Sequence, residues 1–214
     1  MGSRLGLVAV CVALLAWAGW RFVLPILWSS GHAPPIELAA DPVQTALEPV
    51  ERISVTRGDR HFIIEKTHRY EVVGEVLSAT AYDLAWTNDF FDVDVGLLWG
   101  PERESFKSKY RFSQMGRWLF WRSEGPVSDA ERLEINRHIS NNHLIPAEGR
   151  KHLSSAVRWV SKGDQVKIVG ALVRVLDEAG LPLVQSSLTR DDSGDGACEV
   201  VWVDSLQING RVYR

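Results

Sequence analysis

The sequence predicts a mainly β fold, a small antiparallel β-barrel with one or two short helices, following a single N-terminal transmembrane helix. Three observations support this prediction. The first 28 residues are almost entirely apolar. About seven later segments have the alternating or continuously apolar pattern of strands. Glycine, proline, asparagine and aspartate recur between these segments, where turns are expected.

The apolar N-terminal segment runs from Leu5 to Trp28 and contains one charge, Arg21. At about 1.5 Å per residue, a helix of this length would cross a hydrocarbon core of about 30 Å. A signal peptide cleaved near Ala18 is the alternative, but the apolar run continues beyond that site. We therefore expect an uncleaved anchor with Arg21 at the outer interface, where tryptophans would form an aromatic belt. These tryptophans are Trp17, Trp20 and Trp28.

Charge on either side of this segment predicts its orientation. Arg4 precedes the segment, whereas no lysine or arginine follows it until Arg52. Basic residues prefer the cytoplasmic side of a membrane, so we expect a cytoplasmic N-terminus and a periplasmic or extracellular C-terminal domain. The predicted organisation is an anchor over 1–28, a proline-rich acidic linker over 29–51 and an extracytoplasmic β-barrel domain over 52–214.

The chain is mildly acidic, with 24 basic and 27 acidic residues among 214 and a net charge of −3. This balance argues against non-specific nucleic-acid binding, which depends on neutralising phosphates. The two cysteines, Cys11 and Cys198, cannot pair, because Cys11 lies in the predicted anchor. Cys198 begins an alternating segment and is expected to be a buried small residue, with an intermolecular thiol as the alternative.

The predicted strands share apolar alternation or a continuous apolar run bounded by turn residues. They cover residues 61–65, 70–77, 92–99, 107–112, 117–122, 165–176, 183–189 and 198–208. Ser128 and Glu131 have the spacing of a capping box, which predicts a helix from this point. A second helix is expected from about Ala147 to Val160.

The segment from Gly163 to Val173 reads GDQVKIVGALV. It resembles the strand opening G-D-x-V-x-h-x-G (h apolar) of OB-fold-like small barrels. The chain is also similar to membrane-anchored bacterial proteins that carry such a barrel outside the membrane. This resemblance implies an OB-like barrel and no particular activity.

Two histidines, His138 and His143, lie in the most polar segment of the chain. Their separation of five residues suits neither one face of a helix nor one face of a strand. We expect a structural loop whose side chains bind backbone groups. The alternative is a catalytic or zinc site in which this loop converges with His152 and Cys198.

The segment from Asp191 to Gly196 begins like a calcium-binding loop, with oxygen-bearing side chains at Asp191, Ser193 and Asp195. The acid that an EF-hand requires at position 12 is Trp202, so the match fails. We expect a solvated hairpin turn here, with a looser calcium site at Asp191 and Asp195 as the alternative. No cofactor is predicted.

Charged residues alternate along two predicted strands. Asp92 and Asp94 share one strand face, and Lys107, Lys109 and Arg111 share another. We expect the two rows to pair across a hairpin, since opposite charges on neighbouring strands attract. The alternative is a stripe in which Lys109 and Arg111 bind an anion.

Trp118 and Trp121 lie in the segment 117–122, which is apolar on both faces and is the candidate contact surface. The chain contains no nucleophile elbow, Walker loop, H-E-x-x-H or C-x-x-C motif. We therefore expect a membrane-anchored binding or scaffolding module of the cell envelope, whose partners are the membrane and envelope proteins. The alternative is an envelope hydrolase or metal-dependent enzyme that uses His138 and His143.

Overall fold

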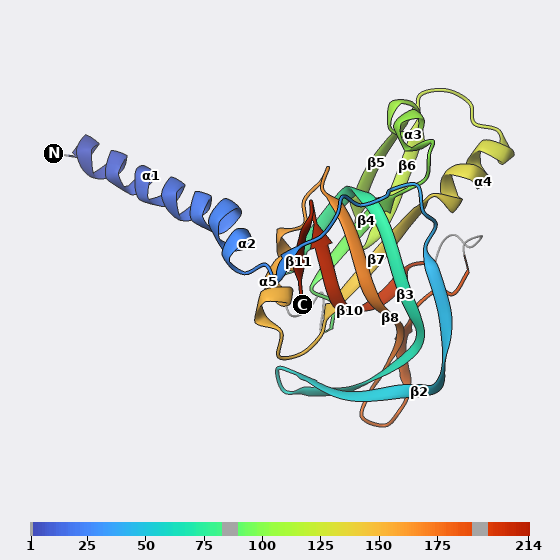
Figure 1. Ribbon diagram of the computed structural model, residues 1–214. Helices are drawn as coiled ribbons and strands as arrows, with labels where there is room; N and C mark the ends of the chain where they lie inside the picture. The colour runs from blue at the N-terminus through green and yellow to red at the C-terminus, as the bar shows by residue number, and fades with distance from the viewer. Residues whose placement is uncertain (1, 83–89, 190–196) are drawn as a thin grey trace.

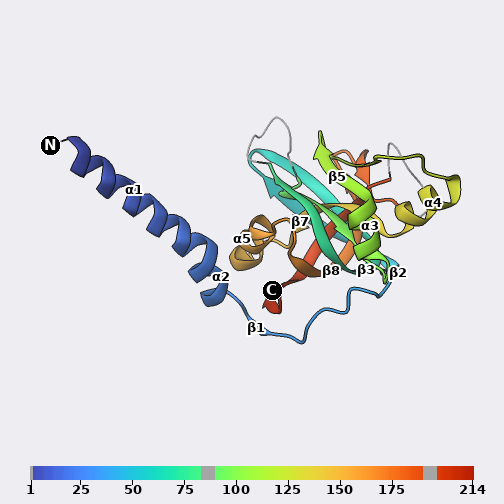
Figure 2. The same cartoon turned by 90° about the horizontal axis from the view of Figure 1, so that it is seen from above.

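The N-terminal helical segment projects away from a body built on β-strands (Figures 1 and 2). The computed structural model describes residues 2–82, 90–189 and 197–214. Helix α1 (Gly2–Ala18) has 17 residues and is followed by a π-helical turn, η1 (Gly19–Val23), and by α2 (Leu24–Leu27). The Leu24 N–H donates to the Gly19 carbonyl, the five-residue spacing that defines the π-helical turn.

No helix in the described part of the chain is both long enough and apolar enough to cross a membrane. This contradicts the predicted single-pass anchor, and the predicted localisation loses its basis. The physical reason lies at Gly19, where the α-helical hydrogen-bond pattern changes after 17 residues.

The end of this helical segment docks on the body instead of forming an aromatic belt. The Trp28 ring stacks on His152 at 4.9 Å between centroids, and Trp20 meets Trp159 edge-on at 5.7 Å. The Tyr213 hydroxyl donates to the Pro25 carbonyl at 2.9 Å. These contacts hold α2 against helix α5 (Lys151–Trp159) and the C-terminal strand.

The body contains one large sheet and one separate hairpin. The strands of the large sheet are β1 (Gly31–His32), β2 (Val43–Arg57), β3 (Arg60–Ala81), β4 (Val93–Leu98), β7 (Ile139–Pro146), β8 (Gln165–Leu176), β9 (Pro182–Gln185), β10 (Glu199–Ile208) and β11 (Arg211–Tyr213). Their order is β1-β11-β10-β7-β4-β3-β8-β9, with β2 paired to β3 and an additional pairing of β10 with β8. The range 29–51, expected to be a linker, thus contains β1 and the first part of β2.

The fold is mainly β but differs from the predicted small antiparallel barrel. Strands β7 and β10 run parallel, and short strands remain at the edges of a nine-stranded sheet. The described chain has five α-helices instead of one or two. Residues 107–109, expected in a strand, end helix α3 (Arg103–Lys109), which leads directly into β5 (Tyr110–Met115).

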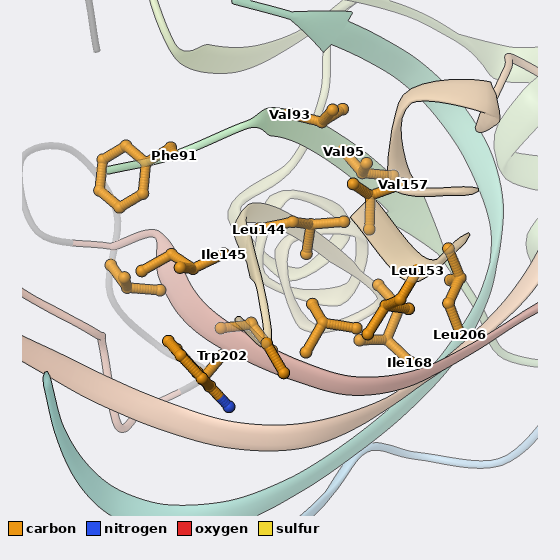
Figure 3. Packing of buried hydrophobic residues seen from close by; sticks show 14 of the residues in the cluster. Phe91, Val93, Val95, Leu144, Ile145, Leu153, Val157, Ile168, Trp202 and Leu206 are labelled. Atoms are coloured by element: carbon orange, nitrogen blue, oxygen red, sulfur yellow. The ribbon is translucent and has the colours of Figure 1, made fainter. Parts of the chain in front are cut away.

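The main hydrophobic core lies between the curved sheet and helix α5 (Figure 3). Val93 and Val95 of β4 point into it together with Leu144 of β7, and Leu153 and Val157 of α5 pack against them. Because side chains alternate along a strand, Asp94 and Gly96 of β4 face the opposite side of the sheet. This opposite side carries the polar residues described below.

The hairpin of β5 and β6 (Trp118–Ser123) covers that opposite side. Leu119 of the hairpin sits over Gly96, where an added Cβ would lie 2.7 Å from a Leu119 methyl carbon. A second hydrophobic cluster anchors the hairpin together with α3 and α4 (Asp129–Arg137). Its buried members are Leu77, Leu98, Phe106, Tyr110 and Ile135.

Candidate functional site

Three neighbouring strands bring an acid, an imidazole and a thiol together under the hairpin. In the sheet register Asp94 of β4 pairs directly with His143 of β7. Cys198 precedes Glu199, the first residue of β10, which pairs with Asn142 of β7. The side chains of Asp94 and Cys198 therefore reach His143 from the two strands that flank β7.

The three side chains form one line of interactions. The His143 Nδ1–H donates to Asp94 Oδ1 at 2.6 Å. Cys198 is the second side chain whose hydrogen bonding and charge act on the His143 imidazole. An acid, an imidazole and a nucleophile in this order form the arrangement used by cysteine and serine hydrolases.

The charges within this line favour a protonated imidazole. Burial lowers the pKa of His143, but the hydrogen bonds and charges of Asp94 and Cys198 outweigh it and raise that pKa to about 9. Asp94 is fully buried and His143 is buried. A protonated imidazole can act as a general acid.

Aromatic residues and an arginine fix the acid end of the line. The Phe91 ring stacks on His143 at 4.8 Å between centroids. The Arg117 guanidinium lies 3.7 Å from Asp94 and over the rings of Phe91 and Tyr82. Burial, followed by the nearby Asp94 carboxylate, raises the pKa of the Tyr82 hydroxyl.

The hairpin turn places Arg117 at this point. Gly116 and Arg117 have φ values of 57° and 72°, the pair of positive values that defines a type I′ turn. A non-glycine residue in this region costs about 1–3 kcal/mol and is found preferentially at functional sites. The turn thereby carries the Arg117 backbone carbonyl over β7, where it accepts a hydrogen bond from Asn141 Nδ2 at 2.6 Å.

Asn141 lies beside the thiol and is held rigidly. Its Nδ2 also donates to Cys198 Sγ at 3.4 Å, while its Oδ1 accepts from Gln114 Nε2 at 3.1 Å. Asn141 and His143 are two residues apart on β7 and so share one face of that strand. The amide is thus an oriented hydrogen-bond donor next to the sulfur.

A cavity of about 350 Å³ opens at Cys198. Its walls come from β6, α4, the start of β7 and the residues just before β10. Trp118 and Trp121, the predicted contact residues, line it together with Arg132, Asn141 and Cys198. The Cys198 thiol and the Asn141 amide therefore border a space of the size used for small-molecule substrates.

The other predicted histidines do not join this site. His138 Nδ1 donates to the Glu134 carbonyl at 2.9 Å, and the His138 ring packs near Gly100 at the far end of β4. His152 stacks on Trp28. The predicted convergence of His138 with His143 and His152 is therefore absent among the described residues.

His138 does meet two carboxylates. The ligand atoms of Glu102, Glu134 and His138 lie within 4.8 Å of one another. Both glutamates are exposed, and such groups often occur together without a metal ion. The proposed calcium ligands Asp191 and Asp195 lie outside the described residues.

The predicted cross-strand charge rows are wrong, because the strands that carry them do not pair. Asp92 binds Arg57 at 2.9 Å, and Asp94 binds His143. Lys107 lies 2.7 Å from Glu75. The predicted anion-binding residues instead pair with carboxylates outside the cavity lining: Lys109 pairs with Glu131, and Arg111 lies 3.8 Å from Glu124.

Like Asn141 and Arg132, Asp94 is a candidate site residue that the sequence analysis did not identify as such. It is an acid in the middle of the strand VDVGLL, and a buried carboxylate is costly unless it is paired. This energetic cost indicated that Asp94 needs a partner, but the sequence did not indicate which residue that partner is.

No known protein family, curated protein or solved structure matches the chain.

Proposed function

We propose that this protein is a cysteine-dependent acyl hydrolase in which Cys198 is the nucleophile. The observation that carries the proposal is the line Asp94–His143–Cys198 ending at a cavity. His143 is the general acid and base, and Asp94 holds it in the required orientation. The predicted binding role stays a prediction, and Trp118 and Trp121, on which it rested, border the same cavity.

In the first half of the reaction the Cys198 thiolate attacks the acyl carbonyl carbon and forms a tetrahedral oxyanion. This intermediate collapses to a thioester as the bond to the leaving group breaks, and the leaving group takes the proton of His143. In the second half water attacks the thioester and gives a proton to His143. The carboxylic acid leaves, and the thiolate and imidazolium are restored.

Asn141 is placed to stabilise the oxyanion. Its Nδ2 lies 3.4 Å from the attacking sulfur, so a carbonyl carbon bonded to that sulfur carries its oxygen close to this donor. Gln114 and the Arg117 carbonyl fix the amide before substrate binds. Donors oriented in advance contribute on the order of 3 kcal/mol to such transition states.

The proposal is tested with 4-nitrophenyl acetate and the full chain. We expect a burst of nitrophenolate and one added acetyl group, located at Cys198 by mass spectrometry. Cys198→Ala removes both signals, whereas Cys11→Ala, the matched control, keeps both because Cys11 lies on the exposed helix α1. His143→Gln slows acylation.

Thermal melting of each variant separates loss of chemistry from loss of fold. If Cys198→Ala retains the burst while folded, the thiol is not the nucleophile. An acetyl group found only on Cys11 or on lysines would have the same meaning.

A further inference from the structure

One arginine borders the cavity without a carboxylate partner among the described residues. Arg132 lies on α4, where its exposed guanidinium sits over the Trp121 ring at 5.6 Å from the centroid. Two other cations near the hairpin, Lys109 and Arg111, are matched by Glu131 and Glu124. The positive charge of Arg132 is therefore available to a ligand.

The Trp121 ring lies beneath this charge at the edge of the cavity. The indole N–H donates to Asn136 Oδ1 at 2.9 Å, which sets the ring orientation from the same helix that carries Arg132. A guanidinium stacked on an aromatic face keeps its hydrogen-bond donors at the edge, free for a carboxylate. Arg132 thus lies over a ring whose own orientation is set by a hydrogen bond to α4.

The remaining described lining is apolar or neutral. Trp118, Leu119 and Phe120 supply apolar surface, and Ser140 and Asn141 supply neutral polar groups. Arg132 is the one arginine, lysine or carboxylate side chain among the described residues that line the cavity. An anionic end on an otherwise apolar ligand complements this surface.

We infer, on the basis of the proposed hydrolase function, that the preferred substrates carry an acyl group ending in a carboxylate. The carbonyl is placed at Cys198 and the apolar part of the acyl chain lies against Trp118 and Trp121. The terminal carboxylate binds the Arg132 guanidinium, which accommodates it through two parallel N–H donors. Arg132 is in this scheme a specificity residue that takes no part in bond breaking.

Two esters with the same leaving group test the inference: mono(4-nitrophenyl) succinate and 4-nitrophenyl butyrate. They differ in a carboxylate that replaces a methyl group. We measure acylation of Cys198 by nitrophenolate release and by intact mass, and subtract the rate of the Cys198→Ala variant to remove spontaneous hydrolysis. The unaltered protein is expected to prefer the succinate ester.

Arg132→Gln is expected to slow the succinate reaction about fivefold, the upper range for an exposed ion pair, and to leave the butyrate reaction unchanged. The matched control is Arg122→Gln, which removes the same charge from an exposed position of β6 outside the cavity lining. It is expected to change neither rate.

The outcomes separate this inference from the function on which it rests. If both esters acylate Cys198 and Arg132→Gln leaves their ratio unchanged, the carboxylate preference is wrong and the hydrolase remains. An equal loss with both esters likewise contradicts it, because a structural role would affect both. If neither ester acylates Cys198, the hydrolase function itself fails.

Discussion

Replacing Asp94 by Asn tests the electrostatics of the site most directly. The substitution keeps the shape of the side chain but removes the charge that faces His143 at 2.6 Å. The pKa of His143 is raised from 6.5 to about 9, and each pKa unit corresponds to about 1.4 kcal/mol. The balance of burial, Asp94 and Cys198 therefore holds the proton on the imidazole by about 3 kcal/mol.

In Asp94→Asn, burial acts against the proton with only Cys198 to oppose it, so the pKa of His143 is expected to fall by about two units or more. Histidine ring signals followed by NMR against pH measure this directly, with His143→Gln identifying the resonance. Asp92→Asn is the matched control, because Asp92 binds Arg57 instead of a histidine.

The same shift has a consequence for stability. The folded pKa of His143 lies above its unfolded value, so its stabilising contribution is full below pH 6.5 and is lost as the pH rises through about 9. The free energy of unfolding, measured in urea, should fall by about 3 kcal/mol over this range from this group. Asp94→Asn should not show that loss.

Two results would refute this reasoning. One is a His143 that titrates near 6.5 in the unaltered protein. The other is an Asp94→Asn protein whose His143 titration and pH-dependent stability match those of the unaltered chain.

Three further substitutions test the fold around the site. Gly170→Ala should lower the free energy of unfolding in urea by about 3 kcal/mol or more, because the new Cβ would lie 1.9 Å from the Trp202 carbonyl oxygen and force β8 away from β10. Gly125→Ala is the control: open space surrounds Gly125, so this substitution should be near neutral. Equal effects of the two substitutions would contradict the close approach of β8 and β10. Ser128→Ala should lower the free energy of unfolding by about 1 kcal/mol, since Ser128 and Glu131 form the capping box of α4. An unchanged free energy of unfolding would mean that the capping box contributes nothing to stability. Trp28→Ala should make the N-terminal helix more sensitive to limited proteolysis, because it removes the stack on His152. Trp17→Ala is the control, since the Trp17 side chain is exposed. Identical digestion of the two variants would argue against docking of the helical segment on the body.

Local pattern was sufficient for several elements. The predicted strand 165–176 coincides with β8, and the predicted strand 198–208 differs from β10 by one residue. The helix expected after Ser128 is α4, because a capping box is a contact among four consecutive residues. Each of these features is encoded within a short window, so neighbouring residues decide it.

Tertiary structure decided the site and the N-terminal segment. Asp94 and His143 are 49 residues apart and meet only because β4 and β7 are neighbours in register. Cys198 reaches them through a parallel pairing of β10 with β7 that alternation along one strand cannot indicate. The apolar N-terminal run indicated a helix, but the π-helical turn and the packing of Trp28 on His152 depend on the surface it meets. Strand order and register arise from burial across the whole chain, so they become visible only once the sheet is assembled.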